Sequence, residues 1–163
     1  MSMTRIELAT WPTPMEPAPR LAAAIGLRHD DLWIKRDDLT GLGAGGNKIR
    51  KLEWTLGTAL ADGADVVITT GAAQSNHARL TAAAAARVGI GSVLVLPGPP
   101  PSERDGNLLL DALLGTDIVW TDVSTLGETT TDAHLEGGGS PLDRAGDASE
   151  ATDTRCPSPL MVV

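Results

Sequence analysis

One lysine stands where the sequence could support covalent chemistry. Lys48 ends the glycine-rich loop Gly41-Leu42-Gly43-Ala44-Gly45-Gly46-Asn47-Lys48, which leads into a segment of helical periodicity. Asn47 is a good N-cap residue, so we expect Lys48 on the first turn of that helix. The positive end of a helix attracts anions and, together with Lys51 one turn on, favours the free-amine form of Lys48. The loop therefore predicts a nucleophilic lysine able to form a Schiff base.

A second group of polar residues lies in the segment Gly71-Ala72-Ala73-Gln74-Ser75-Asn76-His77. It separates a predicted buried strand from a helix, so it belongs at the carboxyl end of a sheet, where α/β proteins bind ligands. Backbone N–H groups there could hold a carboxylate, Ser75 could address a reacting centre, and Asn76 could contact a phenolic oxygen. The alternative is that Ser75 or Asn76 only caps the helix. His77 is more often a surface residue than a proton shuttle.

The glycine-rich loop also matches two other patterns. Gly41, Gly43 and Gly46 satisfy G-x-G-x-x-G, but residues 36–40 intervene between the preceding strand and the first glycine, unlike a dinucleotide-binding turn. A phosphate-binding P-loop is excluded because Asn47 separates Gly46 from Lys48 and no Ser or Thr follows the lysine. A flexible glycine linker before a surface helix stays open as the simplest alternative.

The elements that must position these residues form a regular alternation. Buried strands are predicted at residues 66–70, 92–96 and 116–120, with helices at 77–88 and 107–114 between them. A helix from Asn47 to about Asp62 precedes them, and a short helix and a short strand lie further upstream. Strands without polar alternation, joined by helices, indicate right-handed βαβ crossovers. We predict an α/β fold with a doubly wound parallel sheet covered on both faces.

Composition excludes several classes of protein. The 163 residues have the length of one ordinary domain. Cys156 and the scattered His29, His77 and His134 offer no spacing for a disulfide framework or a closed zinc site. A net charge of −8 argues against nucleic acid as a partner. Without a signal peptide or a membrane-length apolar run, we expect a cytoplasmic protein that does not bind membranes.

The last part of the sequence has a different composition. Helical and strand periodicity ends after about Thr129, and Gly, Ser, Pro, Asp and Thr dominate from there on. Such a segment cannot bury enough apolar surface to offset its ordering entropy. We predict a disordered tail over residues 126–163.

Two stretches together resemble one enzyme family. LWIKRDDLTGLGAGGNKIRKLE, followed after one helix and strand by TTGAAQSNHARLTAAAAARVG, is similar to the signature pair of the D-cysteine desulfhydrase and 1-aminocyclopropane-1-carboxylate (ACC) deaminase family. That family is a branch of the fold type II pyridoxal-phosphate (PLP) enzymes, related to the tryptophan synthase β subunit. The likeness runs from about Ile6 to Trp120 and ceases after Thr129.

The resemblance implies PLP as the cofactor and gives roles to five residues. Lys48 carries PLP, Ser75 is the catalytic partner or nucleophile, and Asn76 contacts the ring oxygen of PLP. Lys51 approaches the phosphate. Ser75, Asn76 and His77 face a small amino-acid substrate, and His77 makes the QSNHAR sequence more similar to desulfhydrases than to deaminases, which typically have glutamine there.

The implied activity is conversion of D-cysteine to pyruvate, sulfide and ammonia, with ACC deamination as the alternative. The resemblance further implies that residues 1–62 are an N-terminal piece of the large PLP domain and that residues 63–125 are the small α/β domain. Family members are about twice as long, and their second half supplies the phosphate loop and the partner of the pyridine nitrogen. We therefore expect a truncated or frameshifted product, with a catalytically dead fragment or an interaction remnant as the third alternative. The sequence leaves monomer and homodimer open.

Overall fold

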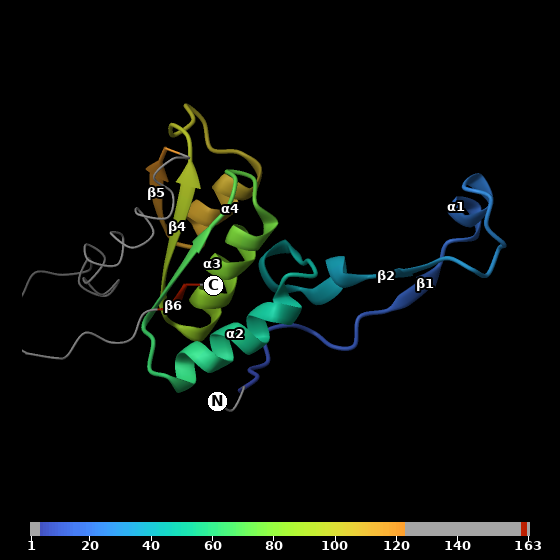
Figure 1. The fold of residues 1–163 in the computed structure, drawn as a ribbon, viewed down its shortest axis with the longest axis horizontal. Helices are drawn as coiled ribbons and strands as arrows, with labels where there is room; N and C mark the ends of the chain where they lie inside the picture. Colours follow the sequence, from blue (N-terminus) through green and yellow to red (C-terminus); the bar gives the residue numbers. More distant parts are fainter. Residues whose placement is uncertain (1–3, 123–160, 163) are drawn as a thin grey trace, which may run out of the picture.

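The core of the protein is a parallel β-sheet flanked by helices (Figure 1). The computed structural model describes residues 4–122 and 161–162. The strands β3 (Val66–Thr70), β4 (Gly91–Pro97), β5 (Asp117–Thr121) and β6 (Met161–Val162) lie in the order β5-β4-β3-β6. All three pairings are parallel, and β3 aligns Val66 with Gly91 of β4. The predicted parallel sheet is confirmed.

Two crossover helices connect these strands. They are α3 (Asn76–Val88) and α4 (Gly106–Leu113), each beginning and ending close to the predicted limits. Because β3, β4 and β5 follow one another in one direction across the sheet, right-handed crossovers place both helices on the same face. Ala78 of α3 and Leu108 of α4 pack there on Leu94 and Leu96 of β4. The helical cover expected on the second face is not seen among the described residues.

The helix that follows Lys48 shares a core with this sheet. α2 spans Ile49–Ala61, and its Ile49, Leu52 and Leu56 are fully buried. They pack with Val67 of β3 and Leu80 of α3 in one cluster. The start of α2, and with it the lysine loop, is thereby fixed relative to α3.

The N-terminal region forms an arm that extends away from the sheet (Figure 1). Its antiparallel strands β1 (Met15–Pro17) and β2 (Trp33–Lys35) carry the short helix α1 (Pro19–Ala24) between them. Two short 3-10 turns, Asp37–Thr40 and Leu42–Ala44, then lead to the lysine loop. The arm therefore continues directly into the predicted functional segment.

Most of the predicted disordered tail lies outside the described residues. Met161 and Val162, however, form β6 and pair with Val67 and Ile68, so the prediction of disorder is wrong for these two residues. The division of the chain at residue 62 stays a prediction. None of the helices in the described part is long and apolar enough to cross a membrane.

Candidate functional site

α2 begins at Ile49, one residue later than predicted, so Lys48 precedes the first turn of the helix. Lys48 occupies the N-cap itself, and no side chain caps this helix end. The prediction that Asn47 caps the helix is wrong, because the Asn47 Oδ1 accepts a hydrogen bond from the Lys48 Nζ at 3.0 Å instead. The side chain of Lys48 is partly exposed. Its amine is therefore accessible at a helix N-terminus.

The loop before Lys48 is held by its own backbone. The Gly46 N–H donates to the Asp37 carbonyl at 2.8 Å and to the Thr40 Oγ1 at 3.0 Å. Gly45 has a φ of +76°, and a Cβ there would lie 1.9 Å from the Asp38 carbonyl oxygen. Only glycine allows this approach. The loop is thus a packed structure, and the flexible-linker alternative is wrong.

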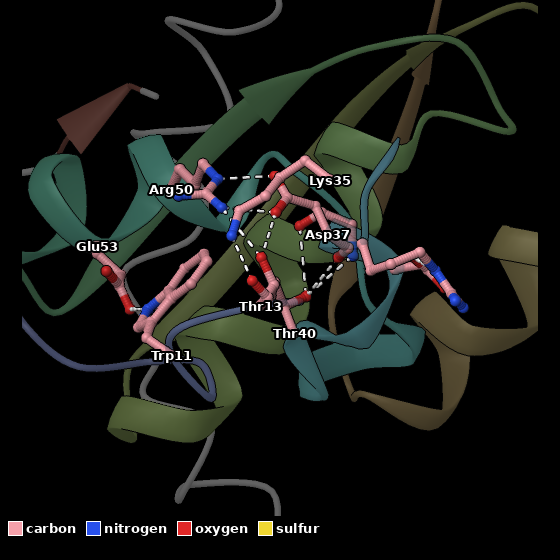
Figure 2. Close-up of polar contacts among 10 residues, drawn as sticks. Trp11, Thr13, Lys35, Asp37, Thr40, Arg50 and Glu53 are labelled. Atoms are coloured by element: carbon pink, nitrogen blue, oxygen red, sulfur yellow. Dashed lines mark hydrogen bonds and ion pairs between the residues drawn. The ribbon is translucent and has the colours of Figure 1, made fainter. Parts of the chain in front are cut away.

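An ion pair next to the lysine anchors α2 to this loop (Figure 2). Arg50 donates to both carboxylate oxygens of Asp37, at 2.7 and 2.6 Å, and Thr13 donates to the same carboxylate at 2.9 Å. The hydrogen bonds from Arg50 hold the pKa of Asp37 at about 2. The guanidinium of Arg50 also stacks on the Trp11 ring at 4.3 Å, and Lys35 donates to the Thr13 carbonyl. The backbone two residues after Lys48 is therefore firmly fixed.

The charged run Arg36-Asp37-Asp38 is more accessible to solvent at its two ends than at Asp37. Arg36 pairs with Asp38 and Glu16 in solvent-accessible bridges. Asp37 is different, because its side chain is only 15% exposed and its partner Arg50 lies thirteen positions away on α2. No local pattern predicts a partner at that separation.

Glu53 anchors the N-terminal segment to the middle of α2. The residue is 1% exposed and accepts hydrogen bonds from the Trp11 Nε1 at 2.6 Å, the Leu8 N–H at 3.0 Å and the Arg5 Nε at 2.8 Å. Burial raises the pKa of Glu53, but these hydrogen bonds outweigh it, so the pKa lies below its ordinary value. The bond from Trp11 links Glu53 to the ring on which Arg50 stacks (Figure 2).

Ser75 is the N-cap of α3. Its extended backbone and its Oγ, which accepts from the Ala78 N–H at 3.2 Å, give the capping role that sequence alone left open. The hydroxyl hydrogen is still available for donation, because the cap uses the oxygen only as an acceptor. His77 is half-buried on the first turn, and its carbonyl accepts from Thr81 at 2.9 Å. Capping therefore leaves a chemical role for Ser75 open.

The side-chain oxygen of Asn76 has two donors. Its Oδ1 accepts from the Arg79 Nη2 at 3.2 Å and from the Asn107 Nδ2 at 3.1 Å. Asn107 also donates to the Gln74 carbonyl at 2.8 Å, and its backbone N–H donates to the Gln74 Oε1 at 2.8 Å. The start of α4 is thus tied to the loop that contains Ser75 and Asn76.

Arg79 brings the two predicted motifs together. The same Nη2 atom that donates to Asn76 also donates to the Gly45 carbonyl in the lysine loop, at 3.1 Å. Arg79 is only 5% exposed, and the negative charge of Asp111 interacts with it from α4. Gly43 and Gly46 pack against the same stretch of α3, where an added Cβ would lie 2.5 Å from Ala83 and 3.1 Å from Leu80, respectively.

Sequence reasoning missed Arg79 and Asn107. The available signal for Arg79 was a charged residue three positions before the alanines of a buried helix face, because such a residue needs a partner. Asn107 had no comparable signal, since it stands at a helix start where asparagine is common. Lys51 is exposed, and its backbone N–H donates to the Lys48 carbonyl at 3.2 Å.

The chain is similar to known proteins in sequence and in structure. Residues 6–150 match the family described as pyridoxal-phosphate dependent enzyme. The match passes Trp120 and Thr129, so the expected end of the likeness was placed too early. A protein named "Putative 1-aminocyclopropane-1-carboxylate deaminase" from Pyrococcus horikoshii is 54% identical over 113 residues, which are 69% of this chain and 33% of that protein.

A second relative and a solved structure also match the chain. D-cysteine desulfhydrase of Salmonella paratyphi B is 45% identical over 126 residues, covering 74% of this chain and 38% of the enzyme. A crystal structure of an ACC deaminase homologue superposes with a TM-score of 0.72 at 46% identity, over 87% of this chain and 42% of that one. The chain thus spans between a third and two fifths of the length of these curated relatives. It belongs to the family of pyridoxal-phosphate dependent enzymes.

Proposed function

We propose that the chain serves a PLP-dependent lyase or deaminase of small amino acids, with D-cysteine as the first-choice substrate. The observation that carries the proposal is the junction at Arg79, where one nitrogen atom joins the loop leading to Lys48 and the side chain of Asn76. An aldehyde cofactor needs an accessible amine and a nearby donor to its ring oxygen. The junction brings the segments that carry both groups together.

The residues present suit PLP. Lys48 offers a primary amine whose one hydrogen-bond partner among the described residues is the neighbouring Asn47. Asn76 has its oxygen occupied by two donors, which leaves its NH2 group to donate to an anionic ring oxygen. When bound, PLP would supply an electron sink for the substrate α-carbon. We assign Lys48 to holding the cofactor and afterwards to moving the α-proton, and Lys51 to the phosphate.

The remaining assignments concern the substrate. The N-terminus of α3 attracts anions, so we assign the substrate carboxylate to it. We assign Ser75 to the reacting side of the substrate and His77 to the sulfur-containing side chain. For D-cysteine the α-proton leaves to Lys48 and the thiol leaves as sulfide. Water then releases ammonia and yields pyruvate.

ACC deamination is the second candidate, and the 54% identity to a protein of that name supports it. ACC has no α-proton, so opening of its ring would require a nucleophile or removal of a β-proton by Ser75 or Lys48. Addition of water and loss of ammonia would give a four-carbon 2-oxo acid. The two candidates thus differ in an easily measured product.

Cofactor binding is tested by adding PLP to the purified full chain. We expect the visible absorbance of lysine-bound PLP, its loss in Lys48→Ala, and its retention with weaker affinity in Lys51→Ala. Borohydride reduction followed by peptide mass analysis should mark Lys48. A colourless chain, or equal labelling of Lys48 and Lys51, would contradict the proposal and favour a non-catalytic interaction role.

Substrate choice is tested by following 2-oxo acids. We expect pyruvate and sulfide from D-cysteine, and a shift toward ACC in His77→Gln, because His77 is the residue that favoured a sulfur substrate. The four-carbon 2-oxo acid from ACC, with no pyruvate from D-cysteine, would replace the first candidate by the second.

A further inference from the structure

We propose that Arg79 and Asn107 are positioning residues, which together fix the side-chain amide of Asn76 so that its NH2 group always faces the ligand. The inference deepens the proposed function and rests on it for the identity of the ligand, an anionic ring oxygen. Neither residue needs to touch that ligand. Each acts through Asn76.

The orientation of the amide follows from donor chemistry alone. A guanidinium has only donors, so the Asn76 atom that faces Arg79 at 3.2 Å must be the oxygen. The side-chain nitrogen of Asn107 is fixed in the same way, because the Gln74 carbonyl that it contacts at 2.8 Å can only accept. Its second hydrogen is then directed to the Asn76 Oδ1 at 3.1 Å. A flipped Asn76 amide would place its NH2 group against two donors.

The position of the Arg79 side chain is itself fixed by burial and hydrogen bonds. Arg79 is 5% exposed, so its guanidinium has little freedom to move. Its Nη2 donates at the same time to the Gly45 carbonyl at 3.1 Å, and Gly45 is three residues before Lys48. The interaction with Asp111 adds electrostatic support from α4. One side chain therefore sets the position of the Asn76 amide relative to the lysine loop.

Lysine cannot replace this arrangement. Its ammonium is a single point on a flexible stem, whereas the planar guanidinium presents donors in a fixed fork. Arg79→Lys therefore keeps the charge but weakens the link between Gly45 and Asn76. Arg87, exposed on the last turn of the same helix, offers a matched control as Arg87→Lys.

A fixed Asn76 amide discriminates between two protonation states of the ligand oxygen. An amide held with its NH2 group outward donates to a deprotonated oxygen and cannot accept from a protonated one. It therefore favours the anionic form of a PLP ring oxygen. Fixing Asn76 should lower the pH at which lysine-bound PLP changes its absorbance, and freeing Asn76 should raise it.

The first experiment needs no cofactor. Side-chain amide NMR on the full 15N-labelled chain measures the order parameter of the Asn76 NH2 group. We expect rigid behaviour in the wild type and in Arg87→Lys, and marked loss of order in Arg79→Lys and Asn107→Ala. Unchanged order in both of the latter variants would overturn the inference. If Arg79→Lys fails to fold, Asn107→Ala decides alone.

The second experiment uses PLP itself. In Arg79→Lys and Asn107→Ala we expect about fivefold weaker binding, the worth of one net hydrogen bond, together with a raised pH midpoint of the visible absorbance. A purely structural role would weaken binding without moving that midpoint, and this result would overturn the positioning role. A wild-type chain that does not bind PLP would refute the proposed function, while the amide order would still decide whether Asn76 is fixed.

Discussion

Asp111 should make the stability of this protein fall as the pH rises through the weakly acidic range. The carboxyl group is 1% exposed, and neither of its oxygens has a hydrogen-bond partner among the described residues. Burial raises its pKa from 3.8 to about 6, and the charge of Arg79 opposes that rise only in part. Between these two values the folded state keeps a proton that the unfolded state has released. The free energy of unfolding therefore decreases with pH across this window.

The size of the effect follows from the shift. A shift of about two pKa units corresponds to about 3 kcal/mol at 1.36 kcal/mol per unit, fully developed above about pH 6. For a chain of this size, such a change lowers the melting temperature by about 6 to 12 °C. Asp111→Asn does not titrate, so its stability relative to the wild type should rise by that amount between pH 4 and pH 7.

Urea unfolding of both proteins at half-unit pH steps measures this difference directly. All other groups titrate alike in both proteins, so their contributions cancel in the difference between the two free energies of unfolding. Removing a charge beside Arg79 changes that difference by an amount that does not depend on pH. Asp65→Asn, at an exposed position before β3, is the matched control and should follow the wild type. Parallel stability curves for wild type and Asp111→Asn would refute the reasoning, because they would mean that Asp111 is ionised at no cost in the folded state.

Three substitutions test the packing around the lysine loop, each measured as the free energy of unfolding in urea. Glu53→Ala should lose about 3 kcal/mol, because the buried acceptor of three N–H groups disappears, whereas the exposed Glu7→Ala should lose less than about 0.5 kcal/mol. Gly45→Ala should cost more than about 3 kcal/mol, since its Cβ would meet backbone 1.9 Å away; Gly98→Ala, with the same sign of φ but open space, should cost about 1 kcal/mol. Leu80→Ala should cost about 2 to 5 kcal/mol from a fully buried site. Equal costs within either matched pair, or a neutral Leu80→Ala, would contradict this packing.

Local chemistry made much of the fold predictable. The apolar runs of β3 and β4 are too short for helices and too uniform for exposed strands, so their burial could be inferred. Gly89 ends α3 in the left-handed conformation, as a glycine after an alanine-rich helix suggests. The capping role of Ser75 was among the expected alternatives for the same reason.

The contacts that were not predictable join distant parts of the chain. Asp37 stands in a run of charged residues, and only the folded loop brings its partner Arg50 beside it. Arg79 reaches back to Gly45, and Asn107 reaches back to Asn76, across separations that no periodic pattern encodes. The position of Asn47 shows a smaller error, in which a neighbouring lysine competes with the helix for the same side-chain oxygen.

The order of the strands has a consequence for how the protein forms during synthesis. β4 and β5 each pair with the strand made just before, so the sheet can grow during synthesis, with one helical crossover to close at each step. β6 is the exception, because its partner β3 is already complete when Met161 and Val162 emerge. Until then one edge of β3 presents unpaired backbone groups. β6 has to pair with this edge before a strand of another chain pairs with it.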